Sequence, residues 1–199
     1  MSNFIVIDLF VEDHAHEEFL KAVLYRLARE EGKSILVRVR SARGGHGRVL
    51  TEFALYQKSV LKAPGDMTMP DLLVIAIDAN CKRFNNARKD IEATIETPFR
   101  TRAIVACPDP HVERWYLADP TSFAEAVGIR PKVGRKKCVR DHYKMILSRA
   151  VVEAGHPPTL GGIEFAREIV DVMHLYHASR AEASLKHFLD ETTARFRLF

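Results

Sequence analysis

Two carboxylates that follow apolar runs are the strongest candidates for chemistry in this sequence. Glu12 comes directly after the run at residues 4–11, and Asp78 comes directly after the run at residues 72–77. Short apolar runs bounded by polar residues predict strands that are buried on both faces, as in parallel sheets. Ligands of such sheets bind just beyond the carboxyl ends of the strands. Both carboxylates therefore stand where a binding site is expected.

These carboxylates could share a cation, because neighbouring strands lie about 4.8 Å apart. Mg²⁺ binds through carboxylates, waters and substrate phosphates, and we expect Mg²⁺ or Mn²⁺ as the cofactor. A metal so placed can activate water and stabilise an in-line attack on phosphorus. His14 and His16, which follow Glu12, could assist a metal or a proton transfer. The alternative is that Glu12 and Asp78 are structural acids or cap the helices that follow them.

The elements around these residues alternate between strand and helix patterns. Further strands are predicted at residues 34–39 and 101–106, with helices after Asp13, at residues 49–61 and at residues 86–96. This alternation predicts an α/β fold with a mainly parallel sheet and helices on both faces. From Val112 on, the sequence is mainly helical, and Thr121 or Ser122 could cap a helix there. We expect an α/β domain at residues 1–138 and a helical C-terminal extension, packed on it, at residues 139–199.

Composition favours a soluble protein in the cytoplasm. The chain has 199 residues, of which 47% are hydrophobic and 28% charged, and its net charge of +4 is compatible with a phosphate-rich partner. The three cysteines lie far apart without a CxxC spacing, so we expect a reducing compartment and no disulfide framework. No run approaches the length of a membrane span and no signal-peptide pattern is present. Patterns typical of zinc proteases and serine hydrolases are also missing.

Three segments resemble a known family. Residues 11–20, VEDHAHEEFL, resemble the first motif of TOPRIM-like proteins, in which a strand ends in Glu. The strand followed by Asp78 and Asn80 resembles their second motif, Asp-x-Asp. Residues 110–119, PHVERWYLAD, are similar to a Pro-x-x-Glu-x-Trp-x-x-x-Asp segment of small TOPRIM-like proteins that are often encoded beside ATPases in bacterial phage-defence operons. The Pro-Lys pair at residues 131–132 also fits, and the resemblance covers residues 4–140.

The resemblance implies a Rossmann-like, TOPRIM-type fold with a Mg²⁺-dependent centre that cleaves or transfers phosphodiesters. Glu12 would be the acid/base or a metal ligand, and Asp78 the main metal ligand. Asn80 stands where the second Asp is usual, and it offers only a neutral carbonyl oxygen. Asp13 stands where Gly is usual and lacks the conformational freedom of glycine. These departures leave open two metals, one metal or no catalysis.

Two further acids fit the family pattern. Glu17 is similar to a recurrent acid that would join the metal ligands, and Glu113 would be catalytic. Each also has a structural interpretation, because carboxylates are favourable near helix N-termini. Trp115 has a structural interpretation too, which is packing in the hydrophobic core. We expect Asp119 to end or cap a helix.

Basic side chains form two candidate surfaces for a nucleic-acid backbone. One lies on and after the second predicted strand and is followed by a glycine-rich loop; it comprises Arg38, Arg40, Arg43 and Arg48. The densest basic run comprises Arg135, Lys136 and Lys137, with Arg130 and Lys132 before it. Solvated turns are the alternative for both surfaces.

Three functions follow from these observations. The first is a Mg²⁺-dependent nuclease acting on DNA or RNA, as the effector of an ATPase-coupled anti-phage system. The second is a nucleic-acid- or ATPase-binding subunit whose catalytic centre has decayed. The third is a Rossmann-like phosphohydrolase acting on small phosphate esters. An oligomeric state is compatible with all three.

Overall fold

The protein is represented by a computed structural model that describes residues 4–41, 46–62, 69–157 and 159–199. Its centre is a four-stranded sheet with the order β2-β1-β3-β4, in which every neighbouring pair is parallel. The strands are β1 (Ile5–Val11), β2 (Ile35–Ser41), β3 (Leu72–Ala76) and β4 (Ala103–Ala106). The predicted α/β class and parallel sheet are thereby confirmed.

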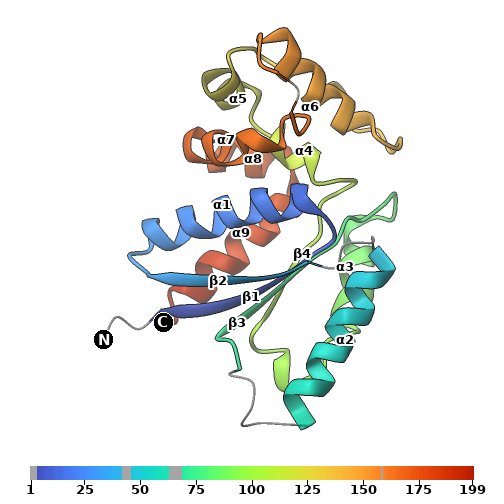
Figure 1. Ribbon diagram of the computed structural model, residues 1–199, viewed down its shortest axis with the longest axis vertical. Coiled ribbons are helices and arrows are strands. Elements are labelled where there is room, and N and C mark those ends of the chain that lie inside the picture. Colours follow the sequence, from blue (N-terminus) through green and yellow to red (C-terminus); the bar gives the residue numbers. More distant parts are fainter. Residues whose placement is uncertain (1–3, 42–45, 63–68, 158) are drawn as a thin grey trace.

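Helices cover both faces of the sheet (Figure 1). On one face lie α1 (His14–Glu30) and α9 (Ala183–Phe196), and on the other lie α2 (His46–Lys62) and α3 (Phe84–Glu92). Alternate strand residues enter the two cores: Val74 packs on the α1 side, whereas Leu73 and Ile75 pack on the α2 side. Because both faces are buried, the strands are continuous apolar runs, which is why they could be predicted.

The remaining helices are short and stack beyond α1 (Figure 1). They are α4 (Glu113–Tyr116), α5 (Pro120–Val127), α6 (His142–Glu153), α7 (Ala166–Val172) and α8 (Leu175–Ala181), with 3₁₀ turns at Thr97–Phe99 and Ile163–Phe165. Their buried side chains share one core with β1, α1 and α9. The residues at 139–199 are therefore continuous in packing with the α/β part.

The N-cap of α5 is Asp119, as one of the two expectations held, and not Thr121 or Ser122. The side chain of Asp119 accepts hydrogen bonds from the peptide N–H groups of Thr121 and Ser122. Thr121 and Ser122 are therefore not the cap. Asp119 has the extended backbone and the acceptor geometry of an N-cap, and Pro120 follows it at the first helical position.

The segment around Trp115 joins the two halves of the chain. The fully buried Trp115 ring stacks on Phe188 with 5.8 Å between ring centroids, and its indole N–H donates to Ser184 Oγ at 2.9 Å. The hydroxyl group of Tyr116 donates to the carbonyl oxygen of Ala15 at 2.8 Å. Core packing of Trp115 is thus confirmed, and this packing fixes α4 between α1 and α9.

The structure contains a disulfide between Cys81 and Cys138, whose Cα atoms are 5.5 Å apart. The expectation of no disulfide was therefore wrong for this pair, while Cys107 is free and buried. The two residues are 57 positions apart in the sequence, and only the folded chain brings their loops together. Among the described residues, no helix combines the length and apolar character needed to span a membrane.

A buried ion pair fixes the junction of α8 and α9. Arg114 lies 2.5 Å from Glu182, and both side chains are almost inaccessible to solvent. Arg114 also donates to the hydroxyl group of Tyr143 at 2.6 Å and lies over its ring. This network ties α4, α6 and the start of α9 together.

Replacing Glu182 with Ala should lower the free energy of unfolding by about 3–5 kcal/mol, because it leaves the Arg114 guanidinium buried without its partner. Chemical denaturation followed by circular dichroism measures this loss. The exposed Glu168→Ala is the matched control and should stay within about 0.5 kcal/mol of the wild type. Equal losses for the two variants would contradict the structural role of the pair.

Candidate metal centre

Glu12 and Asp78 meet at the carboxyl edge of the sheet. Glu12 directly follows β1 and Asp78 lies just beyond β3, and the two strands are neighbours with Val11 opposite Ala76. The peptide N–H of Asp78 donates to Oε2 of Glu12 at 3.2 Å. The expected convergence of these acids is therefore confirmed, while metal binding by them stays a prediction.

His16 completes the group from the first turn of α1. Its fully buried imidazole lies between two carboxylates, with Nδ1 2.8 Å from Oδ1 of Asp13 and Nε2 3.0 Å from Oδ1 of Asp78. Asp13 is the N-cap of α1 and accepts the peptide N–H of His16 at 3.0 Å. Because the cap fixes the first helical turn, it also fixes the direction in which His16 points.

Glu12, His16 and Asp78 could together hold a metal ion. Each offers one ligand atom, and these atoms all lie within 4.8 Å of one another. Carboxylate oxygens suit Mg²⁺ and Mn²⁺, whereas an imidazole nitrogen is a more usual ligand of transition metals. The donor set therefore fits a divalent cation, and the histidine favours Mn²⁺ over Mg²⁺.

The charge of His16 decides how a cation could enter. Burial lowers the pKa of His16, but the charge of Asp78 and the hydrogen bonds to Asp13 and Asp78 outweigh it and raise the pKa well above its usual value. Burial opposes ionisation of Asp13, yet its contacts with His16 lower its pKa to about 2. Because each ring nitrogen faces a carboxylate oxygen, these contacts favour the protonated imidazole, in which both N–H groups donate.

A protonated imidazole has no lone pair for a metal. Nε2 of His16 could therefore hold a metal only after the imidazole has lost that proton, and Asp13 would keep the hydrogen bond to Nδ1. The resulting carboxylate–histidine–metal arrangement is the usual outer shell of a histidine ligand. Proton and metal thus compete for one position.

Glu113 lies in the same electrostatic group. It stands on the first turn of α4 and is partly buried. Burial, together with the charges of Asp78 and Asp13, raises its pKa, which the charge of His16 partly offsets. Glu113 can therefore hold a proton at a higher pH than an exposed glutamate.

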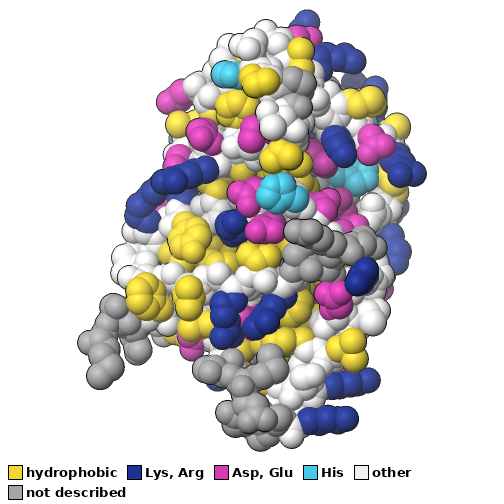
Figure 2. Space-filling model, in the orientation of Figure 1, with side chains coloured by type: hydrophobic (Ala, Val, Ile, Leu, Met, Phe, Trp, Pro, Cys, Tyr) yellow, Lys and Arg dark blue, Asp and Glu magenta, His cyan; other side chains and the backbone are white. Residues whose placement is uncertain are grey.

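Glu17 does not join the group of Glu12, His16 and Asp78, whereas a ligand role for Asn80 stays a prediction. The side-chain amide nitrogen of Asn80 donates to the backbone carbonyl of Asp78 at 3.4 Å, which leaves its carbonyl oxygen as the atom that would contact a cation. Glu17 belongs to a second group with His14 and Glu18 and contacts Lys21 at 3.4 Å. In the space-filling view, acidic and histidine side chains gather between the sheet and the short helices (Figure 2).

The arginines of β2 neutralise a buried acid. Asp8 is fully buried within β1, and its carboxylate accepts from Nε of Arg38 at 2.5 Å and from the hydroxyl of Tyr56 at 2.6 Å. Arg40 lies 3.8 Å from the same carboxylate and above the ring of Tyr56. Both arginines therefore have a structural role, whether or not they also contact a ligand.

Of the remaining basic residues that the sequence proposed for nucleic-acid binding, those that the structure describes lie in two separate places. Arg48 lies on α2 and pairs with Glu52 at 3.2 Å, and Arg43 lies outside the described residues. The run Arg135, Lys136 and Lys137 is exposed and belongs to residues 129–141, which form neither helix nor strand. This run lies near the carboxyl edge of the sheet, because Lys136 pairs with Asp109, just beyond β4.

Comparisons with protein-family models, with curated proteins and with solved structures found no match for this chain. The geometry therefore stands without support from relatives. His16 is the one residue of the centre that the predicted ligand set omitted. Its signal was its place three residues after Asp13 and four after Glu12, at the start of a helix.

In metal-free buffer, the imidazole of His16 should titrate well above the usual histidine pKa of about 6.5. Asp78→Asn and Asp13→Asn should each return it toward that value, and Asn still caps the helix at residue 13. Because the folded pKa is raised, the stabilising contribution is complete below about pH 6.5 and is lost as the pH rises through the folded pKa. Histidine-selective NMR measures this titration, and a wild-type pKa at or below the usual value would contradict the proposed charge.

Proposed function

We propose that this protein is a divalent-metal-dependent enzyme that cleaves phosphodiester bonds of nucleic acid. The observation that supports it is the convergence of Glu12, His16 and Asp78 on one point at the carboxyl edge of the sheet. The proposal agrees with the resemblance of three segments to TOPRIM-like proteins.

Glu12 and Asp78 would hold the cation through their carboxylates, with His16 as a third ligand after loss of its proton. A bound Mn²⁺ or Mg²⁺ supplies Lewis-acid activation of a phosphoryl oxygen and of a water molecule. Asp13 keeps the imidazole oriented through its hydrogen bond to Nδ1. Glu113, whose pKa is raised, would give a proton to the leaving oxygen.

The basic run at residues 135–137 would contact the phosphate backbone on the same side of the molecule. Its side chains are exposed, and Lys136 pairs with Asp109 just beyond β4. Such contacts carry no base specificity and weaken with salt because counterions are released on binding. DNA and RNA are therefore both substrates to be tested.

One observation favours a second function, a nucleic-acid- or ATPase-binding subunit without catalysis. The imidazole of His16 already pairs with both Asp13 and Asp78, and in its protonated form it would supply the positive charge that a metal ion would bring. A centre in which this internal cation is never displaced would bind without cleaving. The resemblance to proteins encoded beside ATPases makes an ATPase the partner to test by co-purification.

Mn²⁺- or Mg²⁺-dependent cleavage of plasmid DNA or RNA should fall by about 10²-fold or more in Glu12→Gln and in Asp78→Asn, since each removes a charged ligand. Glu17→Gln is the matched control. Glu17 lies in the first turn of α1, like His16, but belongs to the separate group with His14 and Glu18, so this variant should retain most of the cleavage activity. Gel-based cleavage at fixed metal concentration measures these rates.

The same assay separates the alternatives. Wild-type rates in the Glu12 and Asp78 variants would contradict the proposed centre. Binding of an oligonucleotide without cleavage would support the non-catalytic subunit, and turnover of a generic phosphomonoester without nuclease activity would support a small-molecule phosphohydrolase.

A further inference from the structure

Three segments far apart in the sequence meet beside the candidate centre. The loop between β3 and α3 contacts the loop after β4, because the peptide N–H of Ala79 donates to Pro108 at 2.8 Å and that of Asn80 donates to Pro110 at 3.2 Å. The segment between α5 and α6, residues 129–141, reaches the same place. We call this segment the basic segment.

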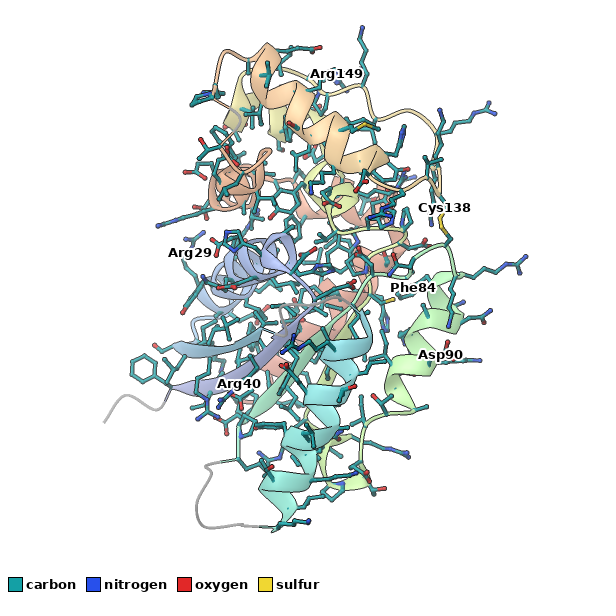
Figure 3. The ribbon with its side chains drawn as sticks, turned by 45° about the vertical axis from the view of Figure 1, so that its right-hand side comes forward. Arg29, Arg40, Phe84, Asp90, Cys138 and Arg149 are labelled. Atoms are coloured by element: carbon teal, nitrogen blue, oxygen red, sulfur yellow. A yellow bond between two sulfur atoms is a disulfide. The ribbon has the colours of Figure 1, made fainter. Side chains whose placement is uncertain are left out.

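The disulfide joins the basic segment to the loop that carries Asp78. Cys81 lies three residues after Asp78, and Cys138 directly follows Lys137. Figure 3 shows Cys138 above the start of α3, near Phe84. The bond therefore ties the basic segment to the loop that follows Asp78, and Lys136 pairs with Asp109 in the loop after β4.

Other contacts hold the ends of the basic segment better than its middle. Pro131 is buried, Val133 packs against the main core, and Tyr143 is fully buried in α6. Between them, Lys136 pairs with Asp109, and the peptide N–H of Lys137 donates to the hydroxyl of Tyr143 at 2.8 Å. A surface ion pair such as that between Lys136 and Asp109 constrains a chain weakly. The disulfide is therefore the stronger constraint on the charged residues 135–137.

Both bridged cysteines are exposed, unlike Cys107, which is buried at the end of β4. A thiolate from solution can therefore reach the bond. Exposed disulfides are the labile ones among protein disulfides, and they exchange with small thiols through a mixed disulfide. Because the bond is accessible and holds the basic segment, its reduction and oxidation could control the position of that segment.

We propose that Cys81 and Cys138 form a reversible thiol–disulfide switch that fixes the basic segment beside the candidate metal centre. In the oxidising direction, the two thiols react with a low-molecular-weight disulfide. The Cys81–Cys138 bond forms, two electrons pass to the small disulfide, and two small thiols leave with the two protons. Excess small thiol reverses the exchange and releases the middle of the segment. The effect of this switch on substrate binding rests on the proposed function, whereas the switch itself does not.

Limited digestion with trypsin tests the switch directly, because Arg135, Lys136 and Lys137 are its cleavage sites. The protein is equilibrated with glutathione and glutathione disulfide in different ratios, and fragments are identified by mass spectrometry. Cleavage in the basic segment should be about tenfold faster in the reduced protein, since proteolysis follows the population of the open segment. Cys81→Ser and Cys138→Ser should be cleaved at the reduced rate in every buffer.

Cys107→Ala is the matched control and should keep the dependence on the glutathione ratio. A variant that fails to fold would be cut throughout its helices rather than in the basic segment, so the fragment pattern separates loss of fold from release of the segment. Equal cleavage rates in oxidised and reduced wild-type protein would overturn the proposal. Failure of the two thiols to become protected from alkylation under excess glutathione disulfide would overturn it as well.

Binding of a fluorescent oligonucleotide adds an arm that depends on the proposed function. The oxidised protein should bind more tightly than the reduced protein at low salt. Equal affinities of the oxidised and the reduced protein for the oligonucleotide would contradict a role of the disulfide in substrate binding. Absence of binding in both forms would count against the proposed function, and the proteolysis result would still decide the switch.

Discussion

The position of His16 between Asp13 and Asp78 is the constraint on which the candidate centre depends. Asp13 caps α1 and holds one ring nitrogen, while the other nitrogen faces the acid that follows β3. Burying an imidazole and a carboxylate is costly unless each is paired. His16 and Asp78 are both buried and pair with each other, and the more exposed Asp13 is the second partner of His16. The pairing therefore fixes the start of α1 against the end of the neighbouring strand, where Glu12 also lies.

The rest of the fold supplies what this arrangement needs. The parallel register of β1 and β3 brings the strand ends together. Glu113, on α4, interacts electrostatically with Asp78, Asp13 and His16. The packing of Trp115 and Tyr116 holds α4 between α1 and α9. The short helices are thus part of the structural support of the acids at the sheet edge.

The fold and the meeting of the acids could be predicted, because runs buried on both faces identify parallel strands and their carboxyl ends share one edge. The sequence suggests a metal or proton-transfer role for His16, but its position between Asp13 and Asp78 could not be predicted, because the sequence does not show in which direction the capped helix points the side chain. Asp8 interrupts an apolar run in the sequence, yet its pairing with Arg38 requires the register that places them opposite each other. The disulfide likewise depends on loops that only the folded chain brings together.

The central claim of the proposal is that Glu12, His16 and Asp78 would hold a divalent cation once His16 has lost its proton. Calorimetric titration with Mn²⁺ in two buffers of different ionisation enthalpy counts the protons released on binding. Near neutral pH the wild type should release about one proton per ion, and His16→Gln should bind more weakly with almost no release. Mn²⁺ binding without proton release, or the same release from His16→Gln, would contradict the claim.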